Sequence, residues 1–290
     1  MKKINRIDLG ILNITIQPHS PERYIELFYD VFKGKFIGKY YGDKQGIISK
    51  IVNITEDVGA LSLRGEISIF TKIDTDGNWF DVKSLDEADE NDLKEINIPA
   101  NLRPNLTRCN FIFDATNHKM YFENRSSNND KFGFKSIERL IYSIFNREKI
   151  VNQYGDVAVC LMPEENALER LLSYPQINKF EMRITPPNPD DLADITEKTM
   201  RRLNSMNAKN MEQSFSSKTK SQSLELDEET KQLAKVASKN GFVKVIARDA
   251  YDRVVQDSTQ EHPQKVFLEY DIEGGVIAAL INFIRSKVRK

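Results

Sequence analysis

Three histidines are the residues of this chain best suited to acid–base catalysis, because imidazole changes its charge near neutral pH. His19, His118 and His262 each lie beside proline or asparagine, in sequences typical of turns. Active sites do occur in turns, but a histidine there is more often a surface residue without a chemical role. A Ser-His-acid triad can assemble from distant residues, yet the chain has no Gly-x-Ser-x-Gly motif. We therefore predict no catalytic residue.

Metal and phosphate sites also lack a sequence signature. Cys109 and Cys160 are the only cysteines and do not have the spacing of metal ligands. Residues 81–95 contain seven acids against two lysines, without the glycine-centred ligand pattern of a calcium loop. No glycine cluster has the strand–turn–helix context of a phosphate loop. We expect no metal and no cofactor, although acids such as Glu66 or Glu123 beside a basic residue leave a metal-dependent nuclease open as an alternative.

Length and composition place the chain among folded proteins of one or two domains. It has 290 residues, of which 40% are hydrophobic, and 42 Lys and Arg balance 43 Asp and Glu. Two separated cysteines and no apolar leader favour a cytoplasmic protein. No run reaches the ~18 apolar residues of a membrane span, so no membrane insertion is expected. Any surface for a polyanion must come from uneven placement of charge.

The N-terminal half reads as hairpins. Period-two alternation predicts strands at 4–16, 46–55 and 61–73, and another hairpin at 109–123. Ser20-Pro21-Glu22 begins a helix, and the acidic stretch 81–95 is expected to be an exposed loop or short helix. We assign residues 1–133 to a hairpin-rich antiparallel β domain with one helix.

From residue 134 onward, helical and strand patterns alternate. An apolar stripe predicts a helix beginning at Ser136. Residues 180–185 alternate as a strand, and the prolines, asparagine and aspartates at 186–191 suit a corner and a helix start. Residues 204–226 are polar and basic and are predicted to form a mobile insert. Residues 134–290 are thus expected to be an α/β domain with helices on a mixed sheet, and the fold class of the chain is α+β.

Basic residues concentrate in two segments of this second half. Residues 196–222 contain six cations against two acids, and no acid follows Glu273. Basic arms of this kind bind DNA or RNA through phosphate contacts and counterion release. The predicted nucleic-acid-binding residues are Lys198, Arg201, Arg202, Lys209, Lys218, Lys220, Arg285, Lys287 and Arg289, with Arg183 and Arg248 as lesser candidates.

Residues 157–191 and 247–263 resemble a bacterial family known as a domain of unknown function and met in phage-defence neighbourhoods. More distantly they are similar to the lambda-phage exclusion protein RexA. The shared order is strand, short Leu-rich helix, strand ending in prolines and basic helix, followed by a turn that here reads Arg248-Asp-Ala-Tyr-Asp-Arg253, without the expected glycine.

The resemblance implies a homodimer or larger homo-oligomer that binds DNA without sequence preference and acts in abortive infection or another anti-phage defence. RNA instead of DNA stays open as the ligand. Two other classes also stay open: a metal-dependent nuclease or RNA-targeting toxin, and a non-catalytic subunit that assembles with another defence protein through the mobile segment.

Overall fold

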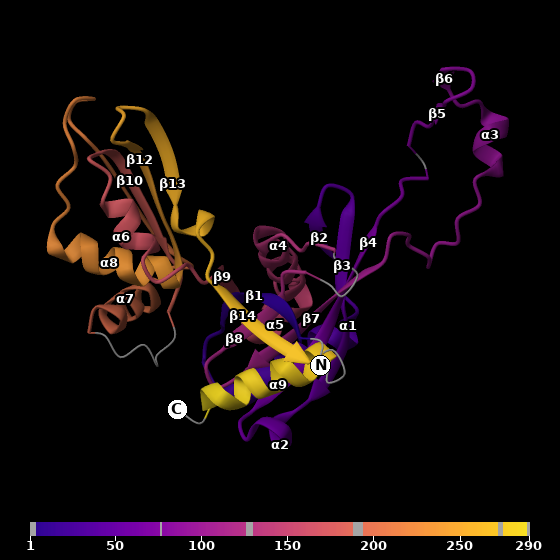
Figure 1. Ribbon diagram of the computed structural model, residues 1–290, viewed down its shortest axis with the longest axis horizontal. Coiled ribbons are helices and arrows are strands. Elements are labelled where there is room, and N and C mark those ends of the chain that lie inside the picture. The colour runs from indigo at the N-terminus through magenta and orange to yellow at the C-terminus, as the bar shows by residue number, and fades with distance from the viewer. Residues whose placement is uncertain (1–3, 76, 126–129, 188–193, 272–274, 289–290) are drawn as a thin grey trace.

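The computed structural model describes residues 4–75, 77–125, 130–187, 194–271 and 275–288, and it confirms the predicted α+β class (Figure 1). Its larger sheet is antiparallel throughout. In sheet order its strands are β14 (Lys265–Asp271), β1 (Ile4–Thr15), β8 (Lys119–Glu123), β7 (Thr107–Asp114), β4 (Ser62–Thr71), β3 (Lys44–Asn53) and β2 (Gly38–Tyr41), and β9 (Ala158–Leu161) pairs with β1 as well.

Helices cover both faces of this sheet, because β1 is apolar on both sides. Leu12 and Ile14 belong to the main hydrophobic core, whereas Leu9 and Ile11 belong to a core on the opposite face. The main core is completed by α1 (Pro21–Gly34), α4 (Phe134–Phe145) and α5 (Glu148–Tyr154), and the opposite one by α2 (Thr55–Val58) and α9 (Gly275–Val288).

The smaller sheet has helices on one face only (Figure 1). Its strands, in sheet order, are β11 (Met211–Ser216), β10 (Gln176–Ile184), β12 (Gly241–Arg248) and β13 (Val254–Ser258). The helices are α6 (Ala167–Leu172) and α8 (Glu228–Lys239), which pack on the sheet, and α7 (Asp194–Ser205), which packs on α8; the 3-10 turn η1 (Thr259–Glu261) follows β13. Within the described ranges, no helix lies on the other face of this sheet.

This second sheet differs from the prediction in two ways. Its pairings are all antiparallel rather than mixed. Residues 204–226, predicted to be a mobile insert, contain β11, which pairs with β10 from Met211↔Ile184 to Ser216↔Lys179. The sequence did not reveal β11 because this edge strand is polar and largely exposed, so it lacks a hydrophobic alternation.

The two sheets do not follow the predicted division at residue 134. Helix α4 follows that position but packs in the core of the larger sheet, and β9 and β14 from the C-terminal half pair with β1. The length of β1 explains this arrangement. The backbone N–H and C=O groups along its edges need hydrogen-bond partners, and strands from elsewhere in the chain provide them.

Gly241, at the start of β12, is required by a close backbone approach. A Cβ atom there would lie 1.9 Å from the carbonyl oxygen of Arg183 on β10. We expect Gly241→Ala to lower the free energy of unfolding by about 1–3 kcal/mol in urea denaturation, because backbone and not a flexible side chain must move. Gly77→Ala, whose added Cβ meets only ordinary contacts, should change stability much less; equal losses for the two variants would contradict this explanation.

An arm formed by residues 72–106 leaves the larger sheet between β4 and β7 and projects away from the rest of the molecule (Figure 1). It contains β5 (Phe80–Asp81), β6 (Asp86–Glu87) and α3 (Glu90–Glu95), the last being the short exposed helix expected from the acidic stretch. Its two ends meet where the Thr71 amide donates to the Pro104 carbonyl oxygen at 3.0 Å.

Candidate functional site

Polar contacts join the two sheets. The Asn13 side-chain amide on β1 donates to Asn240 Oδ1 at the end of α8, at 3.2 Å. The Thr15 hydroxyl lies 3.5 Å from the carbonyl oxygen of Pro186, just after β10. Lys135 on α4 forms an ion pair with Glu261 on η1. These contacts bring the proximal end of the second sheet against the end of β1 and against α4.

A cleft of about 860 Å³ lies beside this junction, a size typical of ligand sites. One wall comes from α4 and residues 154–160, and the other from the ends of β10 and β12 together with residues 207–210 after α7. The cleft is therefore built from segments of both sheets.

Helix α4 supplies the first wall because it is amphipathic. Its apolar face, with Ile137 and Leu140 among others, is fully buried. Lys135, Arg139 and Tyr142 repeat at helical spacing on the opposite face and are exposed, all three lining the cleft. Packing of the apolar stripe thus presents two cations and an aromatic ring to the cleft.

The second wall belongs to the helix-free face of the smaller sheet. Arg183 on β10 and Phe242 on β12 are paired neighbours on this face, and both line the cleft. Arg183 Nε lies 3.4 Å from Glu212 Oε1, but the geometry leaves this buried nitrogen without a hydrogen-bond partner among the described residues. A buried, unbonded N–H is costly, so this nitrogen is an unsatisfied donor beside the cleft.

Lys209 connects the two walls. Its ammonium lies 2.8 Å from Asp156 Oδ1. The hydrogen bond that Lys209 donates to Asp156 is the main cause that raises the pKa of Lys209, and contact with Tyr142 adds to it. Lys209 therefore stays charged at neutral pH, within the cleft rather than on a mobile segment.

Cations outnumber acids among the side chains that line the cleft. Lys135, Arg139, Arg183 and Lys209 line it with two acids, Glu138 and Asp156. Lys135 and Arg183 also pair with Glu261 and Glu212, which lie outside the lining. Burial raises the pKa of Glu138, although the Leu161 amide donates to its carboxylate at 2.8 Å. Three asparagines, Asn204, Asn207 and Asn210, add uncharged hydrogen-bonding groups. Together these groups suit an anionic ligand.

The predicted basic residues lie in three separate places. Lys198, Arg201 and Arg202 are exposed on α7, which ends at the cleft, and Lys209 lies inside it. Lys218 and Lys220 follow β11 at the other end of the sheet, where the Lys220 carbonyl accepts from Gln176. Arg285 and Lys287 are on α9, with Arg285 bonded to the Asp57 carbonyl oxygen. Arg289, like residues 188–191 of the predicted helix start, lies outside the described residues.

Arg248, the other lesser candidate, is engaged within the fold. Its guanidinium lies 3.1 Å from Asp252 Oδ1 and donates to the Asp252 carbonyl oxygen at 2.9 Å. It stands at the end of β12 away from the cleft, where Arg248 pairs with Gln176. A structural role in the β12–β13 turn accounts for these contacts.

Two of the histidines come together although 99 positions separate them in the sequence. The rings of His19 and His118 are edge to face, with centroids 5.5 Å apart. His118 Nδ1 lies 2.8 Å from Asn13 Oδ1, and His19 Nδ1 lies 3.3 Å from the Tyr24 hydroxyl. Neither is fully exposed. Both therefore belong to the polar junction at the end of β1. The sequence had predicted isolated surface residues.

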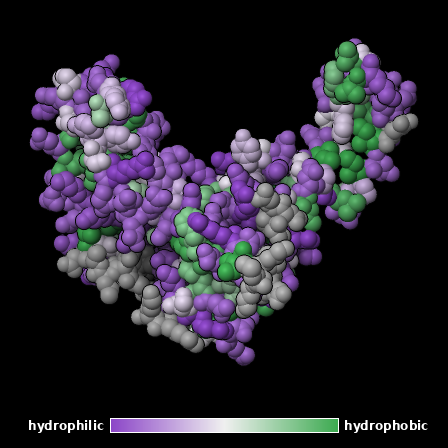
Figure 2. All heavy atoms as spheres, in the orientation of Figure 1, coloured by the Kyte–Doolittle hydropathy of each residue, from purple (hydrophilic) through white to green (hydrophobic). Residues whose placement is uncertain are grey.

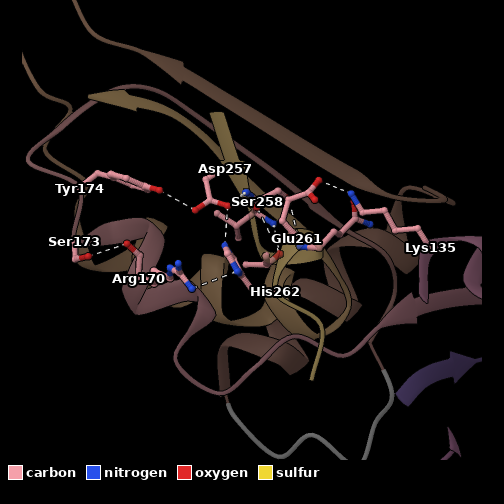
Figure 3. Close-up of polar contacts among 11 residues, drawn as sticks. Lys135, Arg170, Ser173, Tyr174, Asp257, Ser258, Glu261 and His262 are labelled. Carbon is pink, nitrogen blue, oxygen red and sulfur yellow. Dashed lines mark hydrogen bonds and ion pairs between the residues drawn. The ribbon is translucent and has the colours of Figure 1, made fainter. Parts of the chain in front are cut away.

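His262 belongs to a second network, shown in Figure 3. Its Nε2 lies 2.8 Å from Asp257 Oδ1, while Nδ1 lies 3.4 Å from the Arg170 guanidinium. The Tyr174 hydroxyl donates to Asp257 at 2.9 Å. Burial opposes ionisation of Asp257, but the hydrogen bonds from Tyr174 and His262 outweigh it and lower its pKa. In a triad the second nitrogen faces a nucleophilic hydroxyl; here it faces a cation, so this network links α6 to η1.

Lys135, Arg139, Tyr142 and Phe242 were missed by sequence reasoning as site residues. A weak signal existed for the first three, since positions 135, 139 and 142 recur at helical spacing opposite the apolar stripe. Nothing local marked Phe242, whose exposure depends on which face of the sheet the helices leave uncovered.

Among the residues that the structure describes, no group of three or more His, Cys, Asp or Glu side chains could hold a metal ion. In the same part of the chain no helix is long and apolar enough to cross a bilayer. No curated protein matches the sequence. One family model, described as "Domain of unknown function (DUF4747)", matches residues 5–285. Because this match covers nearly the whole length, the chain belongs to the DUF4747 family.

Proposed function

We propose that this protein binds nucleic acid without sequence preference, with the phosphate chain following α7 into the cleft between the two sheets. The observation that carries the proposal is the composition of the cleft, where four cations face two acids, one of them with a raised pKa. Phosphate oxygens are strong acceptors for such Lys and Arg donors.

The exposed side of α7 extends this surface. Thr199 and Leu203 face inward, while Lys198, Arg201 and Arg202 are exposed. Arg201 forms an ion pair with Glu197, but both side chains are mostly exposed, so water already screens the pair and a phosphate can replace the carboxylate at little cost. From α7 the chain runs directly to the cleft, which Asn204, Asn207 and Lys209 line.

Two aromatic side chains favour a single strand over a duplex. Tyr142 is 43% exposed on one wall, and Phe242 is half-buried on the other. Bases of any sequence stack on such rings, and the cleft volume suits one or a few nucleotides rather than a double helix. DNA and RNA both contain the phosphates and bases that these side chains can contact.

The anti-phage role is the second part of the proposal, and it is supported by the sequence resemblance to defence families. A homo-oligomer acting in abortive infection would couple nucleic-acid binding to growth arrest. Cells carrying the wild-type gene should then resist phage infection, and cells carrying cleft variants should not. Equal plaque numbers with and without the wild-type gene, across a panel of phages, would refute the anti-phage role.

Binding is tested by a mobility shift with single-stranded and duplex DNA and with RNA, each across a salt series. We expect Arg139→Ala combined with Lys209→Ala, and separately Arg201→Ala combined with Arg202→Ala, to weaken binding. Each lost phosphate contact should flatten the slope of log affinity against log salt by about 0.7–0.9.

The matched control also removes two positive charges, here from a helix that packs on the smaller sheet. Lys235 and Lys239 are exposed on α8, which covers the opposite face of the second sheet, so Lys235→Ala with Lys239→Ala should preserve both affinity and slope. Failure to bind any nucleic acid at low salt, in a protein whose cleft is unoccupied, refutes the function. Equal slopes for the wild type and both basic-surface variants refute the placement of the site.

A further inference from the structure

The arm formed by residues 72–106 carries apolar side chains that nothing in the molecule covers. No described residue of the arm is buried. Phe80 is 62% exposed, Val82 77% and Leu85 73%. Figure 2 shows hydrophobic residues exposed along the projecting arm. An exposed apolar cluster at the tip of an extension is typical of a contact surface for another protein.

The hairpin of the arm holds this cluster in place. The Leu85 amide donates to the Asp81 carbonyl oxygen at 2.9 Å, and Asp81 also accepts from the Lys83 amide. Leu85 adopts a left-handed backbone with φ of 59°, which is unfavourable for leucine. A glycine or asparagine would suit this turn better, so the exposed leucine is unexplained by the fold of the arm itself.

Charge indicates what the arm contacts. Residues 81–95 have a net charge of −5, while the whole chain has −1, so the remainder of the chain has a surplus of four positive charges. Pairing one arm with another would bring like charges together. The cleft offers the complement, since it combines the cations Arg139 and Lys209 with the aromatic side chains Tyr142 and Phe242.

The arm cannot reach the cleft of its own chain in this conformation, because it projects from the side of the larger sheet opposite to the smaller sheet (Figure 1). We propose that the arm is the contact surface for a second copy of this chain, and that its acidic, apolar tip occupies the second copy's cleft. A two-fold axis then places each arm in the other copy's cleft, which closes the assembly as a dimer.

The first experiment measures mass in solution, without nucleic acid, by light scattering and sedimentation equilibrium. The wild type is expected to be a dimer. Replacing residues 72–103 with two glycines should raise the dissociation constant about 30-fold or more, because a central apolar contact is lost. The Thr71 amide lies 3.0 Å from the Pro104 oxygen, so the shortened connection can close without strain, and circular dichroism confirms folding.

A charge exchange between two variants identifies the surface. Glu90 and Asp92 are exposed on the arm, and Glu90→Lys with Asp92→Lys should weaken the dimer. Arg139→Glu with Lys209→Glu should weaken it equally. In a mixture of the two variants, the basic arm meets the acidic cleft and the unchanged arm meets the unchanged cleft, so a heterodimer is expected at close to wild-type affinity.

A monomeric wild type overturns the proposal, as does a mixture that stays monomeric. A dimer that survives removal of the arm also overturns it. These measurements contain no nucleic acid and test the arm contact by itself: a protein that binds nucleic acid but remains a monomer refutes only the arm contact. An arm seated in the cleft excludes nucleic acid from it, so a dimer that binds none is tested again as the variant without residues 72–103. Absence of nucleic-acid binding by that variant refutes only the function.

Discussion

Phe28→Ala is expected to lower the free energy of unfolding by about 3–5 kcal/mol. Phe28 on α1 is fully buried. Its ring lies against Phe113 with centroids 4.4 Å apart and against Phe145 at 5.0 Å, which joins α1, β7 and α4. Truncation removes this aromatic packing and leaves a cavity that three separate elements cannot collapse to fill.

The measurement is urea or guanidinium denaturation followed by circular dichroism, at one pH and temperature. Phe80→Ala makes the same chemical change on the exposed arm. At protein concentrations low enough to keep the protein monomeric, it should alter the stability of the fold by less than about 0.5 kcal/mol. A loss below about 1 kcal/mol for Phe28→Ala would contradict the central place of this ring in the core. A large loss for Phe80→Ala in the isolated monomer would show that the arm is part of that core.

Glu123→Gln is expected to abolish a fall in stability between pH 4.5 and 7. Glu123 on β8 is buried, and burial raises its pKa to about 7, although the Asn110 amide and side chain donate to its carboxylate at 2.5 and 2.9 Å. Between the two pKa values the unfolded chain ionises while the folded protein keeps its proton. Folded stability is therefore complete below pH 4.5 and is lost as the pH rises through 7, by about 3 kcal/mol in total.

Glutamine keeps the shape and an acceptor oxygen for Asn110 without the charge. The variant and the wild type should thus be similarly stable near pH 4.5, and at pH 8 the variant should be more stable by up to about 3 kcal/mol. Denaturation curves at pH 4.5, 6, 7 and 8 decide this, with Glu90→Gln on the exposed arm as the control that retains the wild-type profile. If the stability of Glu123→Gln and that of the wild type changed with pH in parallel, the raised pKa of Glu123 would be refuted.

The contacts of Glu123 also concern the alternative function of a metal-dependent nuclease, for which Glu66 and Glu123 were candidate residues. Its carboxylate is buried and bonded to Asn110, and Glu66 forms an ion pair with Arg108 at 3.1 Å on the neighbouring strand. Glu66 nonetheless contributes to raising the Glu123 pKa, so the two acids are close enough to interact. Glu123 is buried, and its hydrogen bonds from Asn110 are contacts within the interior of the sheet.

The sequence alone predicted those elements whose residues repeat with a clear local period. The strand predicted at 4–16 is β1 (Ile4–Thr15), and the apolar stripe from Ile137 to Phe145 lies in α4. The acidic, exposed character of 81–95 also followed directly from its composition.

Tertiary structure alone decided where these elements meet. Asn13 contacts Asn240 across 227 positions, β14 returns to pair with β1, and the polar β11 becomes a strand only because β10 offers an unpaired edge. The cleft follows from these pairings, since Arg139, Arg183 and Lys209 lie on different segments. Periodicity reports which face of one element is apolar, whereas long-range contacts depend on the complementarity of distant faces, which no local pattern in one sequence records.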